Sequence, residues 1–134
     1  MRVQDTGDRG QKMENKVKSY KDLIVWQKSM DLVIEIYKLV KKLPKEETYS
    51  LSDQMRRAVV SIPSNIAEGY ARKTTKEYLK FLSIANGSRT ELETQLIICN
   101  KIGYLNEKEI EVAMQKSTEI GKMISTIAFK LTNK

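Results

Sequence analysis

The chain has 134 residues, of which 40% are hydrophobic, 31% are charged and 7% are aromatic. This length accommodates one compact domain with a single core. Six glycines and two prolines are too few for the closely spaced turns of an all-β barrel or sandwich, so the composition favours an all-α fold. The single cysteine, Cys99, excludes an internal disulfide, and the absence of histidine removes the most common general base and imidazole metal ligand.

The charge balance points to the kind of partner. Twenty-four Lys and Arg residues outnumber seventeen Asp and Glu residues, which gives a formal net charge of +7 and a pI near 9.4. Such a surplus favours polyanionic partners by long-range attraction. The sequence contains neither a run of roughly eighteen apolar residues nor the apolar core of a signal peptide. We therefore expect a cytoplasmic protein that does not contact a membrane.

The first twelve residues, MRVQDTGDRGQK, have no apolar period and contain two glycines among polar groups. Such a segment does not repay the entropy that ordering it would cost. We predict that residues 1–12 are a disordered tail or precede a native start at Met13, and that residues 13–134 form one four-helix bundle.

The first helix is predicted from Asp22, as its N-cap, to Leu43, which precedes Pro44. At about 100° per residue, its apolar side chains cover an arc of about 220°, whereas a surface helix needs about 100°. One stripe contains Trp26, Met30, Val33, Tyr37 and Val40, and the adjacent stripe contains Val25, Leu32, Ile36, Leu39 and Leu43. The second stripe either lies inside its own domain or contacts another subunit, and patch size favours the second interpretation. The predicted interface residues are Val25, Trp26, Leu32, Ile36 and Leu39.

The second helix is predicted from Ser50 to Gly69, with Gly69 as its C-terminal cap. Pro63 lies inside this helix, where it has no N–H to donate and clashes with the carbonyl four residues earlier, so we predict a kink. We expect the hydroxyl of Ser61 or Ser64, or a water molecule, to bond the freed carbonyl.

The third helix is predicted from residue 74 or 75 to Ile102 and ends at Gly103, and a capping box of Asn106 and Glu109 starts the fourth. Connections of about two to seven residues predict an antiparallel, up-down-up-down arrangement. Arg89 interrupts the apolar stripe of the third helix. We expect its side chain to snorkel to water. The alternatives are that it pairs with a buried carboxylate or lines a polar cavity between subunits.

The chain shows no catalytic machinery. A di-iron bundle site requires Glu-x-x-His pairs, and this chain has no histidine. Cys99 is surrounded by isoleucines, which indicates a core thiol and not a nucleophile. Glu68, Glu91 and Glu93 are predicted to form ordinary ion pairs on helix surfaces instead of an acid–base or Mg²⁺ site. We therefore expect no catalytic residue, no metal and no cofactor.

Six basic residues are candidates for phosphate contacts from one end or flank of the bundle. They are Arg56, Arg57, Arg72, Lys73, Lys76 and Lys80. Such residues either bind nucleic acid in a sequence-independent, salt-sensitive way or form a solvated charged surface. A second group, Lys38, Lys41, Lys42 and Lys45, lies where a helix C-terminus favours positive charge.

A family resemblance is carried by the segments KSYKDLIVWQKSMDLV, YSLSDQMRRAVVSIPSNIAEGYAR, FLSIANGSRTELETQL and IGYL. The chain resembles the four-helix-bundle family of proteins encoded in intervening sequences of bacterial 23S ribosomal RNA genes, also known as the S23 ribosomal protein family. The resemblance spans about residues 18–131 and is most specific in SIPSNIAEG. It implies an antiparallel four-helix bundle that assembles as a homopentameric ring, and it implies no catalytic residues.

A similar fold is used by the accessory variability protein of diversity-generating retroelements, a basic pentamer that binds nucleic acid and a reverse transcriptase. The resemblance therefore implies a non-enzymatic oligomer that binds RNA or DNA without sequence specificity. The alternative is a protein-interaction scaffold or accessory subunit, for example of a reverse transcriptase, whose role is not nucleic-acid binding.

Overall fold

The computed structural model describes residues 17–133, so the tail predicted for residues 1–12 lies outside the described residues. The described chain is all-α and contains no strand, as predicted. Its helices are α1 (Ile24–Val40), α2 (Leu51–Tyr70), α3 (Thr75–Lys101) and α4 (Glu107–Thr132), and two short 3-10 helices, η2 (Tyr20–Asp22) and η3 (Lys45–Glu47), precede α1 and α2.

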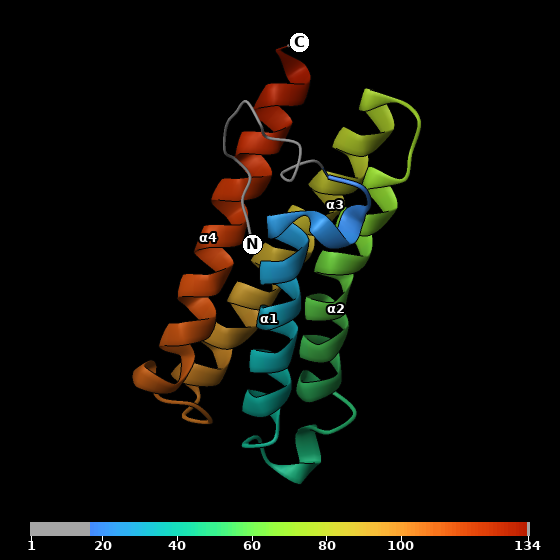
Figure 1. Ribbon diagram of the computed structural model, residues 1–134. Helices are drawn as coiled ribbons and strands as arrows, with labels where there is room; N and C mark the ends of the chain where they lie inside the picture. Colours follow the sequence, from blue (N-terminus) through green and yellow to red (C-terminus); the bar gives the residue numbers. More distant parts are fainter. Residues whose placement is uncertain (1–16, 134) are drawn as a thin grey trace.

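The four helices form a bundle in which α2 packs against α1 and α3, and α4 packs against the same two helices. Figure 1 shows the connection between α2 and α3 and the end of α4 at one end of the bundle, and the other two connections at the opposite end. These are named below the 71–74 end and the 102–106 end. Within residues 17–133, none of the helices combines the length and apolarity that a membrane crossing requires.

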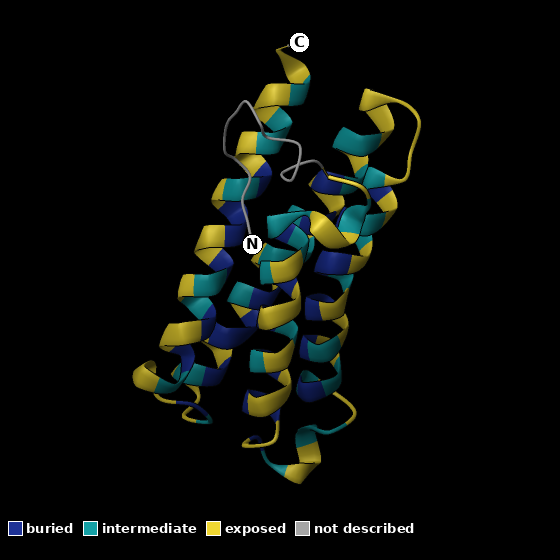
Figure 2. Cartoon of the chain, viewed as in Figure 1, coloured by how far each residue is buried: buried dark blue, intermediate teal, exposed yellow. Residues whose placement is uncertain are grey.

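The core lies between the helices and is built from their inward-facing aliphatic side chains (Figure 2). Val25, Leu32, Ile36 and Leu39 of α1 belong to it and are at most 4% exposed. The prediction that these four residues contact another subunit is therefore wrong. Helix α1 contacts α2 on one side and α4 on the other. These two helices of the same chain together cover a wider arc of the α1 surface than a single neighbouring helix would. Trp26 is partly buried against the rim of the core.

Three of the predicted helix starts are confirmed, and one is wrong. Ser50 is at the N-cap position of α2, although its side chain makes no capping hydrogen bond. The Thr74 hydroxyl accepts an N–H from the first turn of α3, and Asn106 and Glu109 form the predicted capping box of α4. Asp22 instead belongs to η2, where its carboxylate accepts the backbone N–H of the N-cap residue Ser19, and α1 starts after Leu23 without a side-chain cap. The η2 turn uses the Asp22 carboxylate before α1 begins, which explains the difference.

Two glycines shape the ends of helices in different ways. Gly103 adopts the left-handed conformation, with φ of 87°, and ends α3 as predicted. Gly69 is not the predicted cap, because α2 continues to Tyr70. A Cβ atom at Gly69 would lie only 2.8 Å from the Cβ of Phe81. Gly69 therefore allows α2 and α3 to approach each other closely at the 71–74 end.

Helix α2 continues across Pro63 as one helix. The predicted role of the Ser61 hydroxyl at the freed carbonyl is wrong, because this hydroxyl shares a hydrogen bond of 2.7 Å with the Ser88 hydroxyl of α3. It also accepts a hydrogen bond of 2.9 Å from the Asn65 side chain. The polar residues around Pro63 thus connect α2 to α3.

Candidate nucleic-acid interface

The six predicted phosphate-binding residues do not form one cluster. Arg56 and Arg57 lie near the start of α2, whereas Arg72 follows its end, so about 20 Å of helix separates them. Arg56 donates a hydrogen bond of 3.1 Å to the carbonyl of Thr48, and Arg57 forms an ion pair of 3.1 Å with Asp53. Both side chains therefore have partners near the 102–106 end, and the prediction that all six share one surface is wrong.

The four remaining cations do lie together, around the turn between α2 and α3. They are Arg72, Lys73, Lys76 and Lys80. Arg72 pairs with Glu68, and its guanidinium lies 4.8 Å from the centre of the Phe81 ring. The Lys80 ammonium lies 5.9 Å from the same ring. Contacts of this kind contribute about 0.5–1 kcal/mol at exposed sites and hold the cations near the turn.

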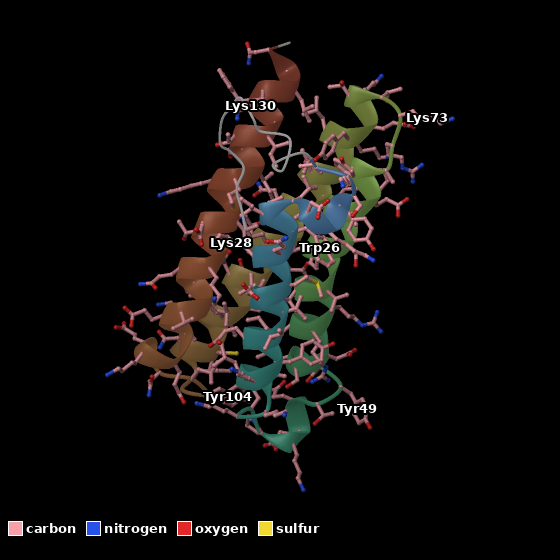
Figure 3. The ribbon with its side chains drawn as sticks, viewed as in Figure 1. Trp26, Lys28, Tyr49, Lys73, Tyr104 and Lys130 are labelled. Atoms are coloured by element: carbon pink, nitrogen blue, oxygen red, sulfur yellow. The ribbon has the colours of Figure 1, made fainter. Side chains whose placement is uncertain are left out.

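Lys73, Lys76 and Lys80 are exposed, and none of them has a carboxylate within ion-pair distance among residues 17–133. Figure 3 shows the Lys73 side chain extending away from the turn. A phosphate group can approach these three ammonium groups without breaking an ion pair.

Two further lysines at this end were missed by the sequence analysis. Lys122 and Lys130 of α4 line a groove of about 370 Å³ between the starts of α1 and α3 and the second half of α4. The other lining residues are Leu23, Ile24, Val25, Tyr78, Met123, Thr126 and Ile127. These lysines lie far from the turn cations in sequence and are eight residues apart, so no charge run marks them. The only sequence signal is their spacing, which places both on one side of α4.

Tyr78 supplies the aromatic wall of this groove. Its ring meets the Tyr70 ring edge-on, with the centroids 6.1 Å apart. Burial, with a smaller effect from Tyr70, raises the pKa of Tyr78 to about 12. The Tyr78 hydroxyl therefore keeps its proton at neutral pH and remains a hydrogen-bond donor.

The positive surplus of the described chain lies in one half of the bundle. The half at the 71–74 end, residues 17–32, 61–88 and 120–133, contains nine Lys and Arg residues against four Asp and Glu residues. The other half, residues 33–60 and 89–119, contains ten of each. A polyanion is therefore attracted to the 71–74 end in preference to the opposite end.

Arg89 pairs with a carboxylate, so its predicted default of snorkelling to water is wrong. Its guanidinium lies 2.8 Å from the Glu93 carboxylate and also donates to Asn86 and to Ser117, at 3.0 and 3.3 Å. The Arg89 side chain is only 14% exposed. A Cβ atom at Gly121 of α4 would lie 2.6 Å from the guanidinium carbon, so this glycine provides the space for Arg89.

Cys99 is a buried core thiol, as predicted, and donates to the Met55 sulfur at 3.7 Å. Burial, with a smaller effect from Glu47, raises the pKa of Cys99 to about 11, which opposes nucleophilic chemistry at neutral pH. Glu68 and Glu93 form the expected helix-surface ion pairs with arginines. Within residues 17–133, no group of three or more Cys, Asp, Glu or His side chains is placed to hold a metal ion.

Comparison with known proteins agrees with this fold. Residues 21–126 match the family described as 23S rRNA-intervening sequence protein, which is most of the chain. The chain belongs to this family. The resemblance identified from its sequence segments is thereby confirmed. No protein with a curated description matches the chain.

The chain is also similar to a protein whose crystal structure is known. That protein is one with unknown function from the S23 ribosomal protein family of Bacteroides thetaiotaomicron. The two sequences are 28% identical, the match covers 78% of this chain and 98% of that chain, and the TM-score is 0.73. Neither description names a catalytic activity.

Proposed function

We propose that this member of the family is a non-enzymatic protein that binds RNA or DNA through its 71–74 end. The observation that carries this proposal is the location of the positive surplus in that half of the bundle. Lysine and arginine contacts to phosphate supply affinity that depends on salt and not on base sequence. The proposed contacts are Arg72, Lys73, Lys76, Lys80, Lys122 and Lys130.

Arg56 and Arg57 are outside the proposed surface because they lie near the start of α2, at the opposite end of the bundle, where both have partners within the chain. Binding of a phosphate to Arg57 would break its ion pair with Asp53, and binding of a phosphate to Arg56 would leave the Thr48 carbonyl without this hydrogen-bond donor. The three exposed lysines of the turn carry no such cost.

A binding titration with one RNA at two ionic strengths tests the proposal. We expect the logarithm of the affinity to fall linearly with the logarithm of salt concentration, with a slope of about −0.7 to −0.9 per phosphate neutralised. Filter binding or fluorescence anisotropy measures this slope. An affinity that does not change with salt, or no binding at micromolar protein, would contradict the proposal.

We also propose that the chain is an up-down-up-down subunit of a homo-oligomer, with the pentameric ring that the family resemblance implies. Two separate apolar surfaces support association. The first is a groove of about 340 Å³ between α1 and α2, lined by Tyr20, Trp26, Met30, Val33, Val60, Pro63, Ser64 and Ala67. The second lies on the outer side of α3, where Ile84 and Ile98 are each 42% exposed and Ile102 is 54% exposed.

Two different apolar surfaces favour head-to-tail association, in which one surface of each copy meets the other surface of the next. Ile34 is 56% exposed and lies one helical turn after the groove residue Met30, so Ile34→Glu is expected to break the oligomer without disturbing the core. Thr118→Glu, at an exposed position of α4, is the matched control. Light scattering gives the mass, and a stable monomer of 15.4 kDa for the unmodified chain would contradict the assembly.

The second candidate is a scaffold whose α1–α2 groove receives a different protein, such as a polymerase. The groove and the exposed side chains of Met30, Ile34 and Tyr37 favour this candidate as much as they favour self-association. Retention on an RNA column separates the two functions. A protein that passes through the column yet captures one defined partner, with the capture lost in Ile34→Glu, would support the scaffold.

A further inference from the structure

The groove at the 71–74 end combines an apolar floor with a cationic rim. The floor includes Leu23, Ile24, Met123 and Ile127, and the rim consists of Lys122, Thr126 and Lys130. The rim residues are four apart, so they follow one another along one side of α4. A ligand that matches this groove carries both apolar surface and negative charge.

Phe129 extends the apolar surface beyond the groove. This side chain is 67% exposed, so packing in the core does not account for its size. Lys122 lies seven residues earlier, which is about two helical turns, so both side chains lie on the same side of α4. An exposed aromatic ring in line with lysines is the combination by which single-stranded nucleic acids are bound, with bases stacked on rings and phosphates beside cations.

The two forms of nucleic acid present different surfaces to such a site. In a duplex the flat faces of the bases are stacked on one another, and phosphates and groove edges are exposed. A single strand also offers the flat face of each base, which is apolar and matches the groove floor and the Phe129 ring. Apolar surface at this end therefore adds affinity only for the single strand.

Exposure of an aromatic ring does not by itself make such a site, as the opposite end of the bundle illustrates. Tyr49 is 94% exposed, but its half of the bundle has no surplus of positive charge. Figure 3 shows Tyr49 and Lys130 at opposite ends of the molecule. Phe129 instead lies in the half of the bundle that has the surplus of positive charge.

Resting on the proposed function, we infer that the 71–74 end binds single-stranded nucleic acid in preference to duplex. One unpaired base lies in the groove beside Tyr78, another stacks on Phe129, and the phosphates between them contact Lys122 and Lys130. The Tyr78 hydroxyl and the Thr126 hydroxyl supply hydrogen bonds to the strand without selecting a base.

The test compares a fluorescent thymidine oligonucleotide of about 20 residues with the duplex that it forms with its complement, at about 50 mM and 200 mM salt. We expect the unmodified full chain to bind the single strand about tenfold more tightly. Phe129→Ala is expected to remove most of that difference and to leave duplex binding unchanged. Tyr49→Ala, the matched control, is expected to change neither affinity.

Phe129→Lys separates stacking from charge. It adds a cation at the same exposed position, so duplex affinity rises while the preference for the single strand is lost. Equal binding of both forms by the unmodified chain, or equal losses for both forms in Phe129→Ala, would overturn the inference and leave the proposed function standing. Absence of binding to either form would overturn both. Tighter binding of an amphipathic glutamate–leucine helical peptide than of the oligonucleotide, lost in Phe129→Ala, would overturn the inference in favour of a protein partner.

Discussion

The two ends of this bundle contain similar numbers of basic residues but different numbers of acidic residues. At the 102–106 end, Lys42 forms an ion pair with Glu109 and Arg57 forms one with Asp53. At the 71–74 end, Lys73 and Lys76 have no carboxylate within ion-pair distance in the described chain. The half of the bundle at the 71–74 end has four acidic residues and the other half has ten, so the net charge of each half is a better guide to polyanion binding than its number of cations.

The 102–106 end is also fixed by more specific contacts. The Tyr104 hydroxyl donates a hydrogen bond of 2.7 Å to Glu47, which joins the α3–α4 connection to η3. Glu109 closes the capping box of α4 and accepts from Lys42 as well. We interpret this end as the structural support of the bundle and the opposite end as its binding surface.

The largest predicted effect compares two matched triple substitutions. Replacing Lys73, Lys76 and Lys80 by Gln is expected to lower RNA affinity about 100-fold at low salt and to flatten the salt slope by about 2 to 3. The same replacement of Lys38, Lys41 and Lys45 is expected to change the affinity much less. Anisotropy titrations measure both, and equal losses would show that the two ends do not differ in function.

The second effect concerns the close approach of α2 and α3. Gly69→Ala is expected to destabilise the protein by about 1–3 kcal/mol, because the new methyl group overlaps Phe81. Gly87→Ala is the control, since a Cβ there meets nothing within 4 Å and alanine favours the helix by up to about 1 kcal/mol. Urea unfolding gives both free energies. An unchanged Gly69→Ala protein would mean that the two helices are not held this closely.

A smaller effect is expected from Tyr104→Phe, which removes the hydroxyl from Glu47 and keeps the ring. The unfolding midpoint should fall by less than in Gly69→Ala, and RNA affinity should stay unchanged because the change is at the supporting end. Thermal unfolding and one titration at fixed salt check these two outcomes. A loss of RNA affinity would place part of the binding surface at the 102–106 end.

The smallest effect is a dependence of stability on acid. The backbone N–H of Asn106, and then Lys42, lower the pKa of Glu109 below its ordinary value of 4.5. Because the folded carboxyl binds its proton less readily than the unfolded one, its contribution is complete above that value and is lost as the pH falls through the folded pKa. In thermal unfolding, Glu109→Gln should therefore be less stable than the unmodified protein at pH 7, and the difference should shrink in acid. A difference that is constant with pH would contradict this assignment.

The fold was predictable from sequence because its signals are local. Gly103 and the Asn106–Glu109 box mark helix ends through contacts within one turn, and the structure has both. The orientation of α1 was not predictable in this way. Both of its apolar stripes look equivalent along the chain, and only the packing of α2 and α4 against α1 decides which stripe is buried.

The candidate site was predictable only in part, because some of its residues come together only when the helices pack. Lys73 and Lys76 follow each other closely in sequence, whereas Lys122 and Lys130 reach the same end through the folding of α4. The partners of Arg56 and Arg57 depend on the local geometry around the start of α2, which charge counting ignores.

The fit between Arg89 and Gly121 links two positions on different helices. A side chain at position 121 would force the guanidinium to shift from its partners, so the glycine is not free to change while the arginine stays in place. During divergence, exchange of the arginine for a smaller apolar residue has to come first or accompany the loss of the glycine. Homologues that have an arginine at position 89 should therefore keep a glycine at position 121. Homologues without that arginine should tolerate alanine or serine at position 121.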